Sequence, residues 1–366
     1  MRLMCLSDLH LGDTKSVLND PAVVTKVVAD LANATGGAVD TLVLNGDIWE
    51  QCIPAGTLEE HPGDGFMSSV AKASRGFFSA LFGAISVGQV VWVPGNHDLS
   101  LWKRLSNAEA CPQFYTPPSG VALARTTSVS QKFFEVLFEG KAPDLFKVAY
   151  PVYLVGKPSP DDFPYVLFTH GHLMDSLIRG EDSEAEYLAL KVLGCRRSLV
   201  PEDASLAEIA RATADFTLAL WKEDSAAGYT FWNMIVRRLS HPHDCPMKGD
   251  PTAYLNPTCH PSSPRDGLMP QASQFLESAL TDDCLPTPVG SLRAPAGENA
   301  AFSKLSCFVF GHDHLGTAAK VVVYGVPFGV FDSGGWTAEF EGHVPHTHAL
   351  LWDDGAIPSY LYLAPR

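Results

Sequence analysis

The stretch "RLMCLSDLH", residues 2–10, runs from an apolar, strand-like segment directly into Asp8 and His10. Four later stretches repeat this arrangement, and they are "TLVLNGD" (41–47), "VVWVPGNHD" (90–98), "YVLFTHGH" (165–172) and "SCFVFGHDH" (306–314). Fully apolar strands separated by helical segments indicate a sheet that is buried on both faces. The sequence therefore predicts an α/β fold whose functional side chains gather just past the carboxyl ends of its strands.

The segments between and after these stretches complete the expected secondary structure. "DPAVVTKVVADLANATGG" (20–37) has Asp20 as a helix N-cap and Pro21 at the first helical position, and it ends in two glycines. A second helix is expected over residues 66–85. Strand character is expected over 2–7, 41–45, 89–94, 151–156, 165–171, 306–311, 319–325, 326–336, 348–354 and 359–364.

The composition of the 366-residue chain is that of a globular protein, with 46% hydrophobic and 18% charged residues. Its net charge of −15 argues against a protein that binds the phosphate backbone of nucleic acids, because that binding needs clustered Lys and Arg. The same charge is compatible with a phosphate-containing substrate, since bound metal ions supply positive charge locally.

The sequence also indicates the compartment. The eight cysteines are scattered with no CxxC pair, which is not a disulfide framework. The apolar part of the chain start is too short for a signal peptide. Residues 76–97 lack Asp, Glu, Lys and Arg, but Gly, Ser, Gln and Pro interrupt them, which favours a helix and a core strand over a membrane span. We expect a cytoplasmic protein without a transmembrane segment.

The polar residues that follow the strands are of the types that bind transition metals. Imidazole and carboxylate groups suit Zn, Fe, Mn or Co, and none of these positions is a cysteine. Each short motif is a weak signal alone, whereas their ordered recurrence at five strand ends is not expected by chance. Seven candidate ligands exceed what one tetrahedral ion needs, and they favour two ions that share a carboxylate. The candidates are Asp8, His10, Asp47, Asn96, His170, His312 and His314.

In this order, "SDLH", "NGD", "PGNHD", "THGH" and "FGHDH" resemble the five signature blocks of the calcineurin-like metallophosphoesterase superfamily. The resemblance covers residues 1 to about 175 and 306 to about 340. It implies a four-layer α/β/β/α sandwich of two mixed sheets, with two metals at the strand ends. It further implies that one ion is held by Asp8, His10, Asp47 and His314, and the other by Asp47 (as bridging ligand), Asn96, His170 and His312.

The same resemblance implies the chemistry. His97 would be the catalytic histidine that stabilises or protonates oxygens in the transition state, and Asp98 would orient its ring. Two divalent or trivalent ions of Mn, Fe or Zn would lower the pKa of a bridging water. The resulting hydroxide would attack phosphorus in line, with no covalent enzyme intermediate. The expected substrate is a small phosphate ester, either a diester or a monoester.

Several neighbouring residues receive separate interpretations. His172 is either a substrate contact or a structural histidine. Glu50 either supports the ligands from behind or is a solvated loop acid, which is the default interpretation. Asp313 is expected to point away from the metals, and "DSGGW" (332–336) is expected to be a structural turn. Tight turns or close approaches of the backbone are expected at Gly46, Gly95, Gly171 and Gly311.

The blocks also bear on the substrate. "GDIWEQC" (46–52) and "GNHD" (95–98) differ from the "GDxVDRG" and "GNHE" blocks of Ser/Thr protein phosphatases, so that activity is disfavoured. "SDLHLGD" and "LNGDIWE" are closer to UDP-2,3-diacylglucosamine pyrophosphohydrolases, a branch that often has Arg where this chain has His97. This departure favours a general phosphodiesterase or phosphomonoesterase and leaves a nucleotide-lipid pyrophosphohydrolase as the alternative. A non-catalytic binding scaffold is a third hypothesis, but it predicts damaged ligands.

The expected domain organisation is a catalytic domain of residues 1–174 and 306–366, interrupted by an insertion at 175–305. The insertion is helical at first and then loop-rich, because ten of the chain's 27 prolines fall between residues 241 and 300. Its aromatic segment either packs its own core or forms a lid lined by Trp221, Tyr229, Phe231 or Trp232. Without a standard zinc spacing, a third metal is disfavoured at His241, His243, Cys245, Cys259 and His260.

Overall fold

The fold is that of a computed structural model of the chain. It describes residues 1–50, 64–98, 146–149, 153–155, 165–174, 305–316, 318–323, 326–337, 345–353 and 358–363. The expected insertion at 175–305, with its candidate lid and its histidines and cysteines, lies outside these described residues. The division of the chain into a catalytic domain and an insertion therefore stays a prediction.

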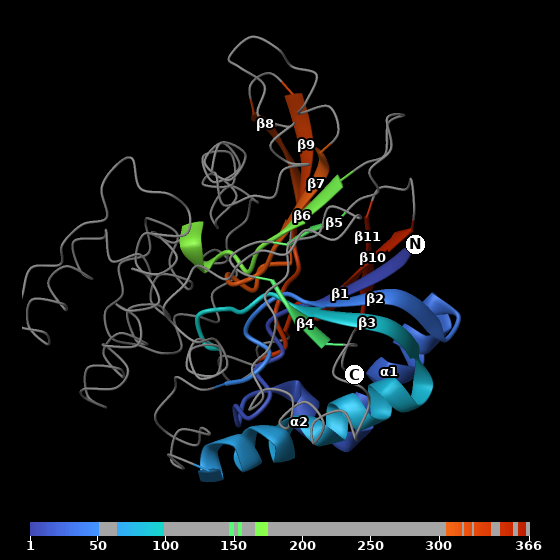
Figure 1. Ribbon diagram of the computed structural model, residues 1–366, viewed down its shortest axis with the longest axis vertical. Coiled ribbons are helices and arrows are strands. Elements are labelled where there is room, and N and C mark those ends of the chain that lie inside the picture. The colour runs from blue at the N-terminus through green and yellow to red at the C-terminus, as the bar shows by residue number, and fades with distance from the viewer. Residues whose placement is uncertain are drawn as a thin grey trace, which may run out of the picture.

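Two mixed β-sheets form the centre of the described structure (Figure 1). The first sheet has the strand order β11-β10-β1-β2-β3-β4, in which β1 to β4 run parallel. Its strands are β1 (Arg2–Leu6), β2 (Ala38–Leu44), β3 (Ser86–Trp92), β4 (Phe146–Val148), β10 (His348–Asp353) and β11 (Ser359–Tyr362). The second sheet has the order β5-β6-β7-β9-β8, in which β6, β7 and β9 run parallel. Its strands are β5 (Tyr153–Val155), β6 (Tyr165–Phe168), β7 (Leu305–Phe310), β8 (Ala318–Val323) and β9 (Val326–Asp332).

The expected strands are confirmed, and the differences at their ends have a physical cause. β2 and β3 begin at residues 38 and 86, before the expected starts at 41 and 89. Exposed positions alternate with more buried ones in these first residues, so they lack the continuous apolar run that marks the buried end of each strand. The strand β4 was not expected, because its three residues are too few for a periodic pattern.

Helices α1 (Pro21–Thr35) and α2 (Asp64–Ala84) lie together on one side of the first sheet (Figure 1). Asp20 caps α1 as expected, because its Oδ1 accepts a hydrogen bond of 2.8 Å from Ala22 N. Two short 3-10 helices, η1 (Val17–Asn19) and η4 (His172–Met174), lie in the loops after β1 and β6. Within the described part of the chain, no helix has the length and hydropathy needed to cross a lipid bilayer.

Alternate side chains of the first sheet face two different cores. Leu6 of β1 belongs to a core that packs against the helices and includes Phe78 of α2. Its neighbour Cys5 belongs instead to the core between the two sheets, together with Cys307 of β7. The described residues thus form a helical layer and two sheet layers of the expected α/β/β/α sandwich. The outer helical layer of the second sheet is not among them.

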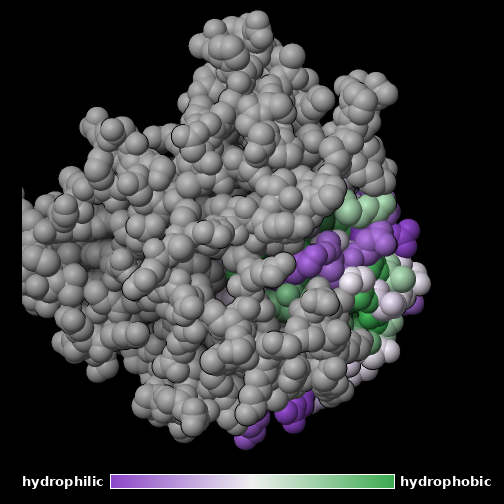
Figure 2. All heavy atoms as spheres, viewed as in Figure 1, coloured by the Kyte–Doolittle hydropathy of each residue, from purple (hydrophilic) through white to green (hydrophobic). Residues whose placement is uncertain are grey.

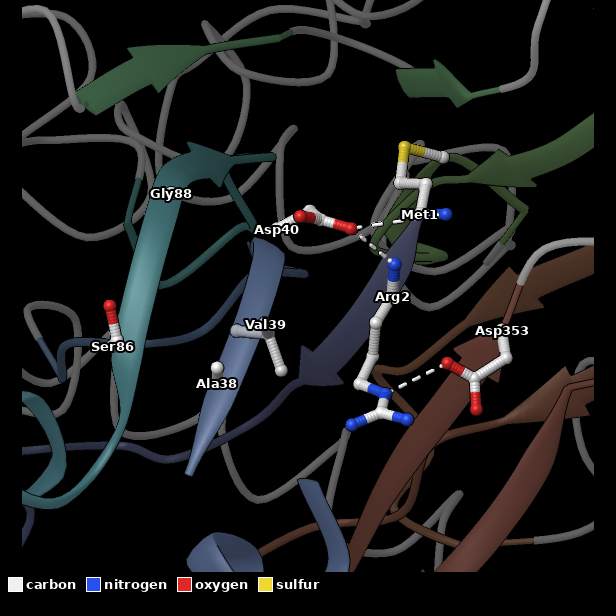
Figure 3. Close-up of a pocket in the computed structure, with 8 residues that line it drawn as sticks. All are labelled: Met1, Arg2, Ala38, Val39, Asp40, Ser86, Gly88 and Asp353. Carbon is white, nitrogen blue, oxygen red and sulfur yellow. Dashed lines mark hydrogen bonds and ion pairs between the residues drawn. The ribbon is translucent and has the colours of Figure 1, made fainter. Parts of the chain in front are cut away.

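The amino-terminal end of the first sheet is a polar surface whose groups already pair with one another (Figures 2 and 3). Arg2 Nε lies 2.9 Å from Asp353 Oδ1, and Arg2 Nη1 donates to Thr35 O at 2.6 Å. Asp40 accepts a hydrogen bond of 2.6 Å from Arg2 N. The side chains of Arg2 and Asp353 are 46% and 61% exposed, so their ion pair contributes little to stability. The buried acidic residues and histidines lie at the opposite end, where the parallel strands finish.

We expect Asp20→Ala to lower the free energy of unfolding by about 1 kcal/mol, because the amide of Ala22 loses its capping acceptor. Urea denaturation followed by circular dichroism measures this change. The matched control is Asp30→Ala, which removes an exposed carboxylate from the same helix. Its 2.9 Å pair with Lys26 is worth about 0.3 kcal/mol. Equal losses in the two variants would contradict the capping role.

Candidate metal centre

The loops that follow β1 and β2 stay paired beyond the last strand residues. Asp8 N donates to Gly46 O at 2.9 Å, and His10 N donates to Asp47 O at 2.9 Å. This pairing holds the D-x-H motif of the first loop beside the G-D motif of the second. Asp8, His10 and Asp47 are at most 2% exposed. Candidate ligands from two motifs meet at one buried position because β1 and β2 are parallel neighbours.

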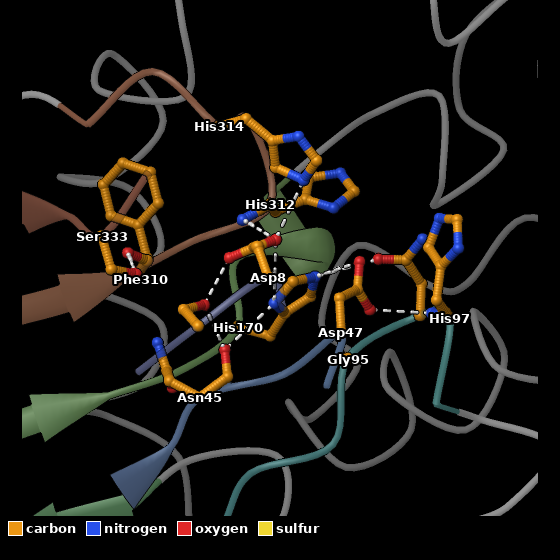
Figure 4. A network of polar contacts seen from close by, with 12 residues as sticks. Asp8, Asn45, Asp47, Gly95, His97, His170, Phe310, His312, His314 and Ser333 are labelled. Carbon is orange, nitrogen blue, oxygen red and sulfur yellow. Dashed lines mark hydrogen bonds and ion pairs between the residues drawn. The ribbon is translucent and has the colours of Figure 1, made fainter. Parts of the chain in front are cut away.

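The backbone is strained at five of the candidate ligands. Among the described residues, the non-glycine residues with positive φ are Asp8 (54°), His10 (45°), Asp47 (50°), His312 (80°) and His314 (58°). Asp and His tolerate this left-handed region better than most residues, but it still costs on the order of 1–3 kcal/mol at each position. Such strain clusters at functional sites, where surrounding structure holds the side chains in one arrangement (Figure 4).

The first group of donor atoms consists of Asp8, His10 and His314. His314 Nε2 lies 3.2 Å from Asp8 Oδ1 and 3.3 Å from His10 Nε2. Ligands held at about 2.0–2.2 Å from one ion are themselves about 3–3.5 Å apart. His314 Nε2 therefore lies at ligand spacing from the other two donor atoms, and all three lie within 4.8 Å of one another.

The second group consists of Asp47, His170 and His312. His170 Nε2 lies 3.0 Å from Asp47 Oδ2 and 3.1 Å from Asn96 Oδ1. The ring of His312 crosses that of His170 with their centroids 5.2 Å apart. Asp47 Oδ2 is also 3.9 Å from His10 Nε2 of the first group. Asp47 thus lies between the two groups, and all seven candidate ligands from the sequence come together.

Glu50 contacts two imidazole rings from behind the first group. It is fully buried, and its carboxylate oxygens lie 2.9 Å from His10 Nδ1 and 2.8 Å from His97 Nδ1. A carboxylate at Nδ1 orients a ring and leaves its Nε2 free, as in most metal-ligating histidines. The interpretation of Glu50 as a solvated loop acid is therefore wrong. A lone acid in a loop forms no pattern in the sequence. The signal that could have identified Glu50 is that buried imidazoles need a hydrogen-bond acceptor.

Asp98 was expected to orient the ring of His97, but its carboxylate forms hydrogen bonds with other groups. Its Oδ2 accepts hydrogen bonds of 3.1 Å from Gly95 N and from Trp92 Nε1. The physical reason is the tight turn that follows β3, in which the Asp98 carboxylate folds back onto a backbone amide three residues earlier. Asp98 therefore holds the turn, whereas Glu50 faces the ring of His97.

The buried charges of the site stabilise one another. Burial acts to raise the pKa of Glu50, but His97 and His10 more than offset it and hold that pKa below its usual range. Burial lowers the pKa of His97, yet Glu50 and Asp47 raise it to about 9. Burial likewise acts to raise the pKa of Asp47, and His170 holds it well below its usual value. Positive imidazoles thus balance the carboxylates, a role that cations can take over.

Two glycines leave room for the ligands. A Cβ on Gly46, whose φ is +85°, would lie 2.3 Å from the ring of His170. A Cβ on Gly95 would lie 2.2 Å from Asp47 Oδ1. Both distances are far below carbon contact distances, so the close approaches expected at these positions are confirmed.

The turn at 332–336 supports the ligand loop after β7. Asp332 accepts hydrogen bonds of 3.1 Å from Gly334 N and 2.8 Å from Gly316 N. A Cβ on Gly335 would lie 2.5 Å from the ring of His314. These contacts agree with the structural role expected for the turn.

His172 lies beside the second donor group, with its ring centroid 5.4 Å from that of His170. Burial and the neighbouring rings of His170 and His312 lower the pKa of His172 well below its usual value, so it is neutral. Its contact with substrate stays a prediction. Asp313 Oδ1 lies 3.4 Å from Leu315 N, and Asp313 belongs to neither the first nor the second donor group.

Comparisons with known proteins identify one family. Residues 1–245 match the model of a family described as calcineurin-like phosphoesterase. This range includes the polar residues after β1, β2, β3 and β6. Among solved structures, a dimetal phosphatase from Danio rerio is similar at 11% identity, with 99% of each chain covered and a TM-score of 0.31. No curated protein matches the sequence.

We expect Gly95→Ala to displace Asp47 and to lower the free energy of unfolding by about 1–3 kcal/mol, because the added methyl group overlaps a buried carboxylate. The matched control is Gly76→Ala in α2, where nothing lies within 4 Å of the added Cβ. Alanine should stabilise the helix there by about 0.5–1 kcal/mol. Chemical denaturation measures both changes. A Gly95→Ala protein as stable as the wild type would refute the close approach.

Proposed function

The chain belongs to the calcineurin-like phosphoesterase family, and from this premise we propose that it uses two metal ions to hydrolyse phosphodiesters and phosphomonoesters of small molecules. Family membership makes the protein a metal-dependent phosphoric ester hydrolase. The substrate class, the identity of the metals and the role of each residue are parts of the proposal.

The observation that carries the proposal is the pair of adjoining donor groups with Asp47 between them. Each group offers imidazole and carboxylate atoms at the mutual distances of ligands on one ion. Glu50 adds the carboxylate that ligating histidines commonly have behind them. The residues present therefore fit two transition-metal ions, of which Mn, Fe and Zn suit these donors.

The residues divide between the ions as the two groups do. Asp47 would bridge the ions, since its Oδ2 lies 3.0 Å from His170 Nε2 of the second group and 3.9 Å from His10 Nε2 of the first. Asn96 joins the second group through its Oδ1, which lies beside His170 Nε2. The first ion would be held by Asp8, His10, Asp47 and His314, and the second by Asp47, Asn96, His170 and His312.

When bound, the two ions supply an activated water as the nucleophile and positive charge for the phosphoryl oxygens. The buried carboxylates and imidazoles hold their donor atoms in place before substrate arrives, because the strained backbone and the paired loops leave them little freedom. His170 and Asp47, which are at most 2% exposed, also keep bulk water away from the reacting centre.

His97 is the residue that we propose moves a proton. Glu50 lies 2.8 Å from its Nδ1, and in the proposed mechanism Nε2 is the atom that acts on substrate. Its ring lies edge to face with that of His10, with centroids 4.8 Å apart, which puts it next to the first donor group. The carboxylate of Glu50 stabilises the positive ring, and His97 can then donate to an oxygen of the phosphoryl or leaving group.

The remaining parts of the proposal concern context. We propose that residues 175–305 are an insertion that decides which ester reaches the centre, since specificity commonly lies in segments added to a scaffold. Contact of His172 with substrate and a cytoplasmic location belong to the proposal as well. The nucleotide-lipid pyrophosphohydrolase remains the alternative substrate class. A non-catalytic scaffold is disfavoured, because the donor atoms are complete and converge.

Hydrolysis of two chromogenic esters tests the proposed activity. We expect the Mn²⁺-loaded protein to hydrolyse bis(p-nitrophenyl) phosphate or p-nitrophenyl phosphate, and a chelator to lower the rate by about 100-fold or more until Mn²⁺ is restored. Absence of turnover with two ions bound would reject the general phosphoesterase. Turnover of UDP-2,3-diacylglucosamine in that case would establish the alternative.

Asp47→Asn tests the bridging carboxylate. An amide offers one neutral oxygen in place of two charged ones, so we expect both ions to be lost or held at least about tenfold more weakly. Metal content per chain is measured by mass spectrometry after gel filtration. Asp40→Asn, at the opposite end of β2, is the control and should keep the wild-type content. Retention of two ions by the Asp47→Asn protein would refute the bridge.

Glu50→Gln tests the carboxylate behind the rings. The Glu50 carboxylate accepts hydrogen bonds from the Nδ1–H groups of His10 and His97. An amide has only one accepting oxygen, so its NH₂ group would face one of these two donors. We expect metal affinity to fall by about 10–100-fold and kcat to fall with metal at saturation. Asp13→Asn is the control, because this buried loop acid accepts from Lys15 N through an oxygen that asparagine retains. Unchanged affinity and kcat in Glu50→Gln would exclude the supporting role.

A further inference from the structure

The candidate metal centre lies where the strand ends of the two sheets meet, a boundary that we call the seam. Asp8 and Asp47 follow strands of the first sheet, whereas His170 and His312 follow strands of the second. Each donor group therefore contains residues of both sheets. A small sliding of one sheet against the other would change the distances within both groups at once, so the seam needs contacts that fix it.

Some of the contacts across the seam use the donor atoms themselves. His170 Nε2 lies 3.0 Å from Asp47 Oδ2, and His314 Nε2 lies 3.2 Å from Asp8 Oδ1. A bound cation takes the lone pairs of these same atoms. A bound cation would replace these contacts, so they cannot hold the seam in the metal-loaded protein.

Asn45 makes two further contacts across the seam, and neither of them uses the donor atoms just named. Its Nδ2 donates to Thr169 O at 2.9 Å, and its backbone oxygen lies 3.2 Å from His170 Nδ1 (Figure 4). The side chain of Asn45 is fully buried. Asn45, which follows a strand of the first sheet, thus contacts two consecutive residues after a strand of the second. Two contacts fix both the distance and the angle between the two strand ends.

We call the contacts of Asn45 with Thr169 and His170 the clamp, and the residues on each side of it are hydrogen-bonded within their own sheet. Asn45 N donates to Leu6 O at 2.8 Å, which continues the pairing of β2 with β1 by one residue. Thr169 N donates to Val309 O at 3.0 Å, which continues the pairing of β6 with β7. Ser7 Oγ also lies 2.7 Å from Asn45 O, within reach of a hydrogen bond. The clamp therefore joins two rigid sheet ends rather than two loops.

The contact at His170 Nδ1 has a consequence for the ring itself. A backbone carbonyl only accepts, so Nδ1 must carry the hydrogen. In a metal-bound ring, Nε2 then presents its lone pair toward Asp47 and Asn96. The carbonyl of Asn45 selects this tautomer, and its side-chain amide keeps that carbonyl aligned with the ring.

We propose that Asn45 is a positioning residue of the metal centre, which selects the tautomer of His170 and fixes the second donor group relative to the first. This inference rests on the proposed two-metal function. It differs from a ligand role, because Asn45 contacts the ligand His170 directly and is not itself a ligand. Its effect should therefore fall mainly on the ion that His170 holds.

Titration with Mn²⁺ followed by electron paramagnetic resonance tests the proposal. The wild-type protein is expected to bind two ions and give the spectrum of a coupled pair. In Asn45→Leu, which keeps the size and removes the donor, we expect the ion that His170 holds to bind about 10–100-fold less tightly and the pair spectrum to give way to that of single ions. Equal affinities and spectra in the two proteins would overturn the role of Asn45.

The matched control is Thr35→Val, which also removes a buried hydrogen bond, the one of 2.8 Å from Thr35 Oγ1 to Leu31 O at the end of α1. It should bind both ions as the wild type does. If it weakens the second ion equally, general loss of stability explains the effect and the proposal is overturned. A wild-type protein that binds fewer than two ions contradicts the proposed function as well, which separates the two failures.

Nuclear magnetic resonance of the Zn²⁺-loaded wild type keeps the test decisive even if Asn45→Leu does not fold. In the Zn²⁺-loaded protein we expect the ring proton of His170 on Nδ1. We expect the side-chain amide protons of Asn45 to exchange slowly with solvent, both with and without Zn²⁺. A proton on His170 Nε2, or Asn45 amide protons that exchange as fast as those of exposed asparagines, would overturn the inference.

Discussion

Burial of charge at the strand ends is the constraint on which the rest of the site depends. Asp8 and Glu50 are fully buried and Asp47 is 2% exposed. Leaving such a group unpaired costs on the order of 3–5 kcal/mol, so each needs positive charge beside it. The histidines meet this need when protonated and bind cations when neutral. One requirement therefore explains both why acids and histidines occur together at the strand ends and why the site suits metal ions.

The fold meets this constraint with rigid strand ends rather than with the local preferences of the loops. Five ligand candidates sit in the left-handed region, each costing on the order of 1–3 kcal/mol, and they follow directly on β1, β2 and β7. The cores on both faces of the first sheet hold these ends in place. Asn45 extends the same rigidity across the seam, so the two sheets act as one support for the donor atoms.

Much of the fold and of the candidate site could be predicted from sequence, and the failures share a cause. Buried strand ends are continuous apolar runs, so their positions were predictable, whereas the half-exposed starts of β2 and β3 and the short β4 were not. Asp98 next to His97 suggested an orienting pair, but sequence neighbours in a tight turn point in different directions. Glu50, 47 residues from His97, faces that ring instead.

The kind of site could be predicted without the structure, because ligand chemistry and a position directly after an apolar strand are local properties of the chain. The sequence therefore supplied all seven candidate ligands and the catalytic candidate His97. The pairing of individual atoms needed the folded structure, since Glu50 beside two histidines and Asn45 beside His170 are contacts between distant segments. Such contacts depend on strand order and on the packing of two sheets, and neither leaves a periodic trace in the sequence.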